Sequence, residues 1–201
     1  MSHLNNIYHA DTVQSLFNEI APTYTHTNQI ASFGLEKLSR KFLLHDVKPN
    51  NAAINVLDMM CGSGENWNLI KTHYPNATIY AIDLSEKMML QAQQNNIDYF
   101  NNSIQLKTGD ILKNEYPNVF FDIIVCSFGV KCIAQDQLTI LMDEIQRLLK
   151  TDGQYVFIEF GLPRPIISKF FSVIVLKYIF PTIGGLIYSQ KKQYQQLWSY
   201  A

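Results

Sequence analysis

Residues 56–64, VLDMMCGSG, decide the fold because they join a buried strand to a helix through a glycine-containing turn. The apolar run AAINVLDMM (52–60) predicts a strand that is buried on both faces. Gly62 and Gly64 permit a tight turn and let a ligand approach the backbone closely. N–H groups at the start of the following helix would face such a ligand. The stretch therefore predicts a strand, a ligand-binding turn and a helix in succession.

Further strands and helices alternate on both sides of this stretch. Apolar runs predict strands at TIYAID (78–83), FDIIVCSF (121–128) and GQYVFIEF (153–160), and IQLKTGD (104–110) predicts a weaker one. Helical spacing predicts a helix over 135–150, followed by Gly153 as a stop signal, and Ser85 is placed to cap a helix that runs to about Asn95. The alternation predicts an α/β fold: a doubly wound, Rossmann-like, mostly parallel sheet with helices on both faces.

Two helical regions flank this alternating part. Residues 11–45 predict helix with a break at Pro22. Residues 165–180 predict helix again, entered through the rigid segment GLPRP.

The composition of the 201 residues excludes several classes of protein. Apolar residues make up 47% and charged residues 16%, which rules out a disordered chain, and the net charge of −1 gives no basic field to attract nucleic acid. The three cysteines form neither a disulfide framework nor a CxxC pair, so we expect a reducing, cytoplasmic setting. The N-terminus lacks a signal-peptide pattern, and Lys169, Lys177 and Pro181 interrupt the longest apolar stretch before it could span a bilayer.

Polar residues at the predicted strand ends distinguish between ligands. The dinucleotide fingerprint needs a small residue where this chain has Trp67, and Asp58 suits a cationic group better than a pyrophosphate. Asp83 can accept both hydroxyls of a ribose, and Asp110, after Gly109, can accept from an exocyclic amine. An amino acid, a ribose and an adenine laid across three strand ends describe S-adenosylmethionine. The alternative is that each aspartate caps the helix that follows it.

Five stretches, in order, resemble the class I S-adenosylmethionine methyltransferases, and more narrowly the ubiquinone/menaquinone biosynthesis C-methyltransferase family. They are FNEIAPTYTHTNQIASFG, VLDMMCGSGEN, YAIDLSEKMM, VCSFGVK with LLKTDGQYVFIEFGLP, and IFPTIGGLIYSQKKQYQQLWSYA. The match covers most of residues 15–200. It implies an N-terminal helical lid (1–50), a cofactor-binding core (51–161) and a C-terminal helical cap (162–201).

The strand ends and the resemblance together give the residues expected around the cofactor. They are Asp58, Cys61, Gly62, Ser63, Gly64, Asp83, Leu84, Met88, Gly109, Asp110, Ile111 and Ser127. Methyl transfer from a sulfonium requires no metal, and none of the five histidines pair at ligand spacing.

Four residues are candidates for handling the acceptor. His26 is a candidate general base, since an imidazole titrates near about 6.5, and Tyr24 can hydrogen-bond an acceptor oxygen. Lys131 stands where the family has the arginine of its SFGLRN segment, and it can steady a phenolate without the bidentate geometry of arginine. Glu159 can orient the acceptor. The alternatives are solvent exposure for His26 and Lys131, packing for Tyr24 and a buried, paired carboxylate for Glu159.

The chain departs from the family pattern in three places. Lys131-Cys132 replaces Arg-Asn, and Thr25 replaces the acid that follows the lid tyrosine. The family continues past the cap into a pair of strands at the sheet edge, whereas this chain stops at Ala201. We therefore expect the strand at 153–160 to be an open edge unless it is covered. A truncated chain, a naturally short relative and an edge-pairing homodimer are the alternatives.

These features predict a methyltransferase that moves the methyl group of S-adenosylmethionine to a small apolar or aromatic acceptor, with a ring carbon of a prenylated quinol as first choice. Oxygen and nitrogen acceptors stay open. A cofactor-binding but non-catalytic or partner-dependent subunit is the alternative from another class, and Trp67 and Asp58 disfavour an NAD-binding oxidoreductase. We expect no nucleic-acid partner. The apolar segment Ile166–Tyr188 can form a mouth for the prenyl chain, contact the inner face of a membrane peripherally, or simply pack on the sheet.

Overall fold

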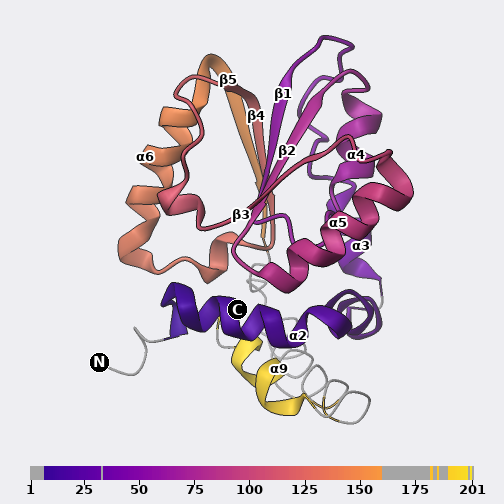
Figure 1. Cartoon of the computed structure of the whole chain (residues 1–201), viewed down its shortest axis with the longest axis vertical. Helices are drawn as coiled ribbons and strands as arrows, with labels where there is room; N and C mark the ends of the chain where they lie inside the picture. The colour runs from indigo at the N-terminus through magenta and orange to yellow at the C-terminus, as the bar shows by residue number, and fades with distance from the viewer. Residues whose placement is uncertain are drawn as a thin grey trace, which may run out of the picture.

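The computed structural model describes residues 7–32, 34–159, 182, 185, 190–198 and 200. Its centre is a five-stranded sheet made of β1 (Asn55–Met59), β2 (Thr78–Asp83), β3 (Gln105–Thr108), β4 (Phe121–Ser127) and β5 (Leu149–Ile158). The strand order is β3-β2-β1-β4-β5, and all four pairings are parallel. The predicted doubly wound α/β fold is therefore confirmed (Figure 1). Within the described residues β5 forms one edge of the sheet, as expected.

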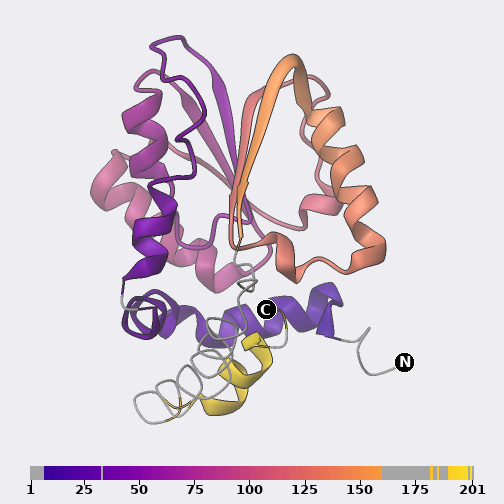
Figure 2. The ribbon, with the colours of Figure 1, turned by 180° about the vertical axis from the view of Figure 1, so that it is seen from behind.

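Helices cover both faces of this sheet (Figures 1 and 2). Helices α4 (Trp67–His73) and α5 (Glu86–Phe100) cover one face, where Ile70 and Ala92 join a buried apolar cluster. Helix α6 (Leu138–Leu148) covers the other face, where Leu141 and Ile145 join a second cluster. The 3₁₀ turns η1 (Ile111–Lys113), η2 (Val130–Cys132) and η3 (Gln135–Gln137) connect these layers.

A third layer lies across the carboxyl ends of the strands. It consists of α2 (Ala10–Ala31), with α3 (Leu35–Arg40) at its end and α9 (Lys191–Trp198) packed beneath it (Figures 1 and 2). A third apolar cluster joins α2 to α9 through Leu16, Ile20 and Tyr194. The central sheet is thereby closed at the end where open α/β sheets bind ligands.

The structure corrects the predicted break at Pro22, because α2 runs unbroken from Ala10 to Ala31. A proline inside a helix removes one hydrogen bond and strains the preceding turn. Contacts on both sides of the proline hold the helix together. Before it, Asn18 Oδ1 accepts from Ser85 Oγ at 2.7 Å. Beyond it, the Thr23 and Tyr194 hydroxyls are 3.0 Å apart.

Two other boundaries differ from the sequence prediction. The helix expected over 135–150 is shorter, and β5 begins at Leu149, so Gly153 lies inside the strand and is no helix stop. A Cβ at Gly153 would lie 2.9 Å from Leu149 Cδ2, and the β4–β5 register shifts between Phe121 and Ile123, as is common where glycine marks an irregular strand.

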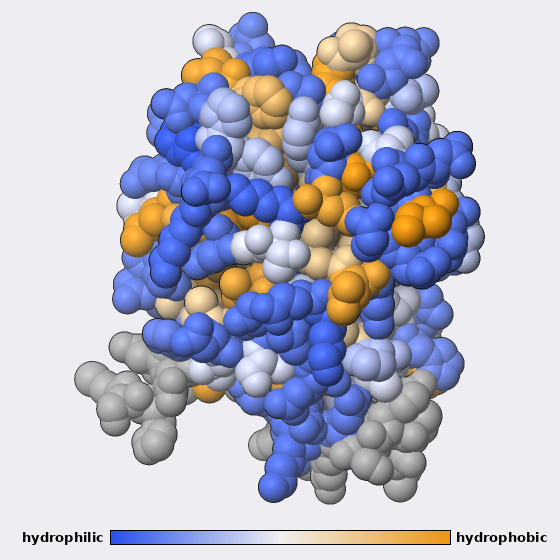
Figure 3. Space-filling model, in the orientation of Figure 1, coloured by the Kyte–Doolittle hydropathy of each residue, from blue (hydrophilic) through white to orange (hydrophobic). Residues whose placement is uncertain are grey.

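Helix α5 begins as predicted. Ser85 Oγ accepts from Met88 N at 3.1 Å, and the helix runs past Asn95 to Phe100. The helix expected at 165–180 lies outside the described residues. Within the described part of the chain, no helix has both the length and the apolar character to cross a bilayer. Hydrophilic side chains cover most of the face shown in Figure 3.

Candidate functional site

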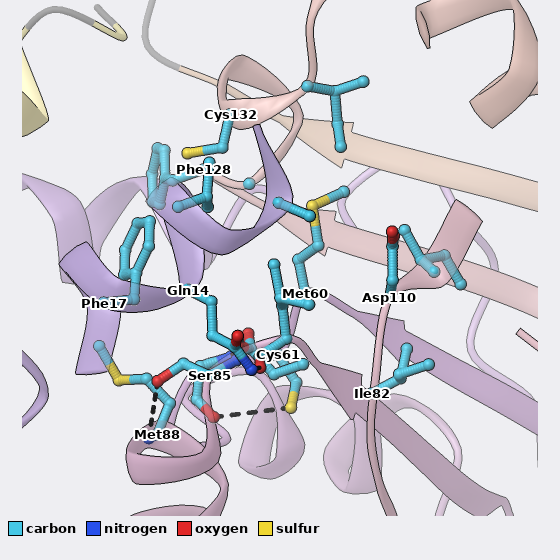
Figure 4. A pocket seen from close by; sticks show the side chains of 18 of the residues that line it. Gln14, Phe17, Met60, Cys61, Ile82, Ser85, Met88, Asp110, Phe128 and Cys132 are labelled. Atoms are coloured by element: carbon cyan, nitrogen blue, oxygen red, sulfur yellow. Dashed lines mark hydrogen bonds between the residues drawn. The ribbon is translucent and has the colours of Figure 1, made fainter. Parts of the chain in front are cut away.

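A cavity lies between α2 and the carboxyl ends of the strands (Figure 4). Its wall is built from α2 and from the turns that follow β1, β2, β3 and β4. Of the residues predicted to bind the cofactor or acceptor, those that line it are Tyr24, Cys61, Gly62, Asp83, Leu84, Met88, Gly109, Asp110, Ile111 and Ser127. Among the predicted residues, Asp58, Ser63, Gly64, His26, Lys131 and Glu159 are not part of this lining.

The turn after β1 adopts the tight conformation that its glycines predict. Gly62 and Gly64 have φ of 57° and 93°, and Met60 also has a positive φ of 55°. A Cβ at Gly64 would lie 2.6 Å from the Trp67 ring, so only glycine fits there. The Trp67 indole is fully buried in the core under the turn, 5.5 Å from the Phe100 ring, and it does not line the cavity. The tryptophan therefore supports the turn from behind.

Two backbone N–H groups of this turn make hydrogen bonds within the protein. Gly64 N donates to Cys61 O at 3.0 Å, and Gly62 N donates to Asp83 Oδ2 at 2.8 Å. These two N–H groups therefore serve the turn and Asp83 instead of facing a ligand. The reason is that a turn this tight satisfies its own donors.

Asp83 lines the cavity at the end of β2. Its Oδ1 accepts from Ser85 N at 2.9 Å, and its Oδ2 accepts the bond from Gly62. Burial raises the pKa of this carboxyl, and the hydrogen bonds from Ser85 and Gly62 oppose that rise. Each carboxylate oxygen has two lone pairs, so the group retains acceptor capacity toward two ribose hydroxyls.

Asp110 both caps a helix and lines the cavity, two roles that were alternatives in the sequence. Its Oδ1 accepts from Leu112 N at 2.9 Å and so caps η1. The residue also lines the cavity, and Figure 4 shows its side chain in the wall. Helix capping therefore orients this side chain without removing it from the wall.

Asp58 does not reach the cavity, although the sequence placed it beside a cationic ligand group. Its side chain is fully buried, and Oδ1 accepts from Asn66 Nδ2 at 2.8 Å. Within the described residues, Oδ2 has no hydrogen-bond partner. Burial raises the pKa of Asp58 to about 7, although the Asn66 hydrogen bond opposes the rise. Asn66, at the start of α4, comes between this carboxyl and the cavity wall: Ser127 Oγ donates to its Oδ1 at 2.9 Å.

Several residues that the sequence analysis did not single out also line the cavity. They are chiefly Gln14, Phe17, Arg40, Met60, Glu65 and Phe128. Phe128 has a positive φ of 60°, and the Arg40 guanidinium lies 5.1 Å from its ring centroid. Strained backbone of this kind is concentrated at functional sites. The position of Glu65 directly after the glycine turn was a usable signal, whereas Arg40 has none in the local sequence.

The acceptor candidates Lys131 and Glu159 pair with each other. Lys131 Nζ lies 3.7 Å from Glu159 Oε1, and Lys131 N donates to Glu159 Oε2 at 3.2 Å. Glu159 is therefore a paired carboxylate, which was the alternative to its role in orienting the acceptor. The Lys131 ammonium lies 5.9 Å from the ring centroid of Phe128, which lines the cavity, so the pair is close to the lining although neither residue belongs to it.

The two lid candidates are placed differently from each other. Tyr24 lines the cavity, with its ring 5.7 Å from that of Phe17, whereas His26 is exposed on α2 and outside the lining. Burial, together with the charge of Glu36, raises the pKa of Tyr24 well above its usual range. Tyr24 is therefore a hydrogen-bond donor at neutral pH.

The chain matches the model of the ubiE/COQ5 methyltransferase family over residues 4–201. It belongs to the ubiE/COQ5 methyltransferase family. This protein is 27% identical over 189 residues to the ubiquinone/menaquinone biosynthesis C-methyltransferase of Geotalea uraniireducens, covering 93% of this chain and 79% of the relative. It is also 27% identical over 195 residues to the demethylmenaquinone methyltransferase of Staphylococcus aureus, covering 96% and 78%.

Solved structures show the same fold. A phosphoethanolamine N-methyltransferase of Haemonchus contortus, in complex with S-adenosylhomocysteine, aligns with a TM-score of 0.64 at 18% identity, over 81% of this chain and 39% of that one. The YcgJ protein of Bacillus subtilis aligns with a TM-score of 0.56 at 18% identity, over 68% and 56%.

Family membership makes this chain an S-adenosylmethionine-dependent methyltransferase. The residues present fit that cofactor. Gly62 and Gly64 shape a close-approach turn, the half-buried Asp83 carboxylate retains acceptor capacity, and Gly109 and Asp110 continue the same wall.

Proposed function

We propose that this methyltransferase acts in quinone biosynthesis and methylates a small aromatic acceptor, with a ring carbon of a prenylated quinol as the substrate. The observation that carries the proposal is the apolar and aromatic half of the cavity. It is lined by Tyr8, Val13, Phe17, Phe128 and Ile133, next to the strand-end residues that suit the cofactor. The relatives named for ubiquinone, menaquinone and demethylmenaquinone methylation support the same substrate class.

The arrangement of side chains in the aromatic half of the cavity favours a flat acceptor. Phe17 projects from α2, and Phe128 stands near it on the turn after β4, with Met60 deeper in the cavity (Figure 4). Aromatic rings bind other rings by edge-to-face or offset stacking, and Phe17 already makes such an edge contact with Tyr24 at 5.7 Å. A quinol ring placed between the lid and the turn would have aromatic neighbours on more than one side.

The chain's own residues supply positioning and charge. When bound, S-adenosylmethionine supplies the methyl group. Tyr24 keeps its proton and can donate to a ring oxygen of the acceptor. Lys131, behind Phe128, can stabilise a phenolate through its positive charge, and Glu159 fixes its position. A phenolate would push electron density onto the ring carbon. That carbon would take the methyl group as its bond to the cofactor sulfur breaks, with S-adenosylhomocysteine as the leaving group, and would then lose its own proton to water.

The test is to incubate the purified chain with methyl-labelled S-adenosylmethionine and a lipid extract of its host, and to identify the labelled product by mass spectrometry. We expect the label on a ring carbon of a quinol. Label on an oxygen or a nitrogen would redirect the assignment to those acceptors. Loss of all transfer by the isolated chain, with cofactor binding intact, would favour the partner-dependent alternative.

A pair of variants tests the role of Lys131. Lys131→Ala should lower kcat by about 100-fold, the usual effect of removing a group that stabilises developing charge. The matched control is Lys107→Ala. Lys107 also pairs with a glutamate, Glu115, at 3.3 Å and lies 5.2 Å from a tyrosine ring, but it is outside the cavity lining. Equal activity of both variants would remove Lys131 from the mechanism.

A further inference from the structure

Some of the charged side chains that line the cavity have no role yet toward a ligand. Among the described lining residues, the acids are Glu65, Asp83 and Asp110, and Arg40 is the one cation. Asp83 and Asp110 suit the ribose and the adenine of the cofactor, as argued above. Arg40 and Glu65 are left without a role toward any ligand. The amino-acid tail of S-adenosylmethionine carries one negative and one positive group, and it too is left without partners because Asp58 is buried away from the cavity.

Arg40 is held rigidly and is poised to bind an anion. Its side chain is 12% exposed. Its Nε donates to Glu36 Oε1 at 2.8 Å, Nη2 donates to the same oxygen, and Nη1 donates to Asn66 Oδ1 at 3.2 Å. These bonds use three of the five N–H groups of the guanidinium, one on each nitrogen. The remaining two N–H groups, one on each terminal nitrogen, are left to donate to a carboxylate.

Glu65 carries the opposite charge and is also held by hydrogen bonds. Its Oε1 accepts from Ser63 Oγ at 2.7 Å and from Thr25 Oγ1 at 3.1 Å. Its Oε2 lies 3.2 Å from the point where a Cβ at Gly62 would stand, so this oxygen is directed against the glycine turn. Burial lowers the pKa of Arg40, but the charges of Glu65 and Glu36 and the hydrogen bond to Glu36 together leave that pKa raised.

We infer that Arg40 and Glu65 together bind the amino-acid tail of the cofactor, with its carboxylate on the Arg40 guanidinium and its ammonium on Glu65. The two tail groups are attached to one carbon, so their partners must be close neighbours of opposite charge on one wall. Arg40 and Glu65 meet that condition, because both line the cavity and Arg40 Nη1 donates at 3.2 Å to Asn66, the residue next to Glu65. Thr25, which replaces the acid that the family resemblance led us to expect, donates to Glu65 and so helps to orient it.

The inference rests on the cofactor and not on the proposed acceptor, so its test contains no acceptor. Two ligands are compared by isothermal titration calorimetry: S-adenosylhomocysteine, which has the amino-acid tail, and 5′-methylthioadenosine, which has the same nucleoside without it. Arg40→Gln and Glu65→Gln should each weaken S-adenosylhomocysteine binding by roughly 10- to 100-fold, as loss of a hydrogen bond to a charged group does. Binding of 5′-methylthioadenosine should change by less than about twofold, since it has no groups for these residues to bind.

Matched controls come from the second arginine–glutamate pair of the described chain. Arg147 donates to Glu144 Oε2 at 2.7 Å, three residues away on α6, and neither lines the cavity. Arg147→Gln and Glu144→Gln should leave both affinities unchanged. Retained binding of 5′-methylthioadenosine shows that a variant is folded. If Arg40→Gln fails to fold, Arg40→Lys keeps the charge beside Glu36 but loses the fork, and it should still lose affinity for S-adenosylhomocysteine selectively.

Equal losses for both ligands, or no loss for either, would overturn the assignment of the tail to Arg40 and Glu65. A chain that binds both nucleosides as expected but methylates no quinol would contradict the proposed acceptor and leave this inference intact.

Discussion

Asp58→Asn tests whether burial of the Asp58 carboxyl lowers the free energy of unfolding as the pH rises. Asp58 is fully buried, accepts one hydrogen bond from Asn66, and has a second oxygen without a partner in the described structure. An asparagine keeps the shape and the acceptor oxygen. It places an amide nitrogen where a carboxylate oxygen stood, so no charge needs to be buried.

The size of the effect follows from the raised pKa. The pKa of Asp58 rises from 3.8 to about 7, so the ionised form is disfavoured in the folded state. Because the folded pKa is the higher one, stability is greatest below about pH 4 and falls as the pH rises toward 7. At about 1.4 kcal/mol for each pH unit, the total cost well above pH 7 is roughly 4 kcal/mol, of which about 3 kcal/mol develops between pH 5 and pH 8.

Urea unfolding at pH 5 and at pH 8 measures this difference. The free energy of unfolding of Asp58→Asn minus that of the wild type should increase by about 3 kcal/mol from pH 5 to pH 8. Other groups with shifted pKa, such as Asp83, are present in both proteins and cancel from the comparison to first order. Parallel pH dependence of the two proteins would refute the reasoning.

Three further variants test the glycine turn, the aspartate expected to bind the ribose, and the anchoring of α2. Gly64→Ala should lower stability by about 2–3 kcal/mol in thermal unfolding, because φ is 93° and Trp67 blocks the added carbon; an unchanged Tm would contradict this. Asp83→Ala should weaken S-adenosylhomocysteine binding by roughly 1–3 kcal/mol in calorimetry, and unchanged affinity would place the ribose elsewhere. Asn18→Ala should speed amide hydrogen exchange in α2 relative to the strands, because it removes the bonds to Ser85 and Glu86; equal protection would argue against that anchor.

The fold was predictable because its signals are local. Strands β1, β2 and β4 are short apolar runs, and Ser85 caps α5 through a residue three positions away. The errors at Pro22 and Gly153 arose where distant contacts overrode local preference. Pro22 is kept inside α2 by bonds to Ser85 at the start of α5 and to Tyr194 of α9. Gly153 lies within β5 because the strand already pairs with β4 at Leu149 and, after a register shift, pairs with it again from Gln154.

The candidate site was predictable only in part, for the same reason. The positions of Gly62, Asp83 and Asp110 follow from where strands end, because the carboxyl ends of parallel strands meet at one edge. Whether a strand-end acid faces the cavity depends on what packs against it. Asn66 covers Asp58 from the start of α4, and no spacing in the sequence announces that contact.

The lid shows most clearly why the remaining residues were hidden. Gln14 Nε2 donates to Leu84 O at 3.1 Å, 70 positions along the chain, and Asn18 Oδ1 accepts from Ser85 Oγ, 67 positions along. Both partners belong to the turn that also carries Asp83. The lid is therefore anchored by polar side chains to the segment that would hold the ribose. This anchoring fixes the orientation of α2 and brings Phe17 and Tyr24 to the cavity wall, although their sequence positions look no different from the exposed His26 nearby.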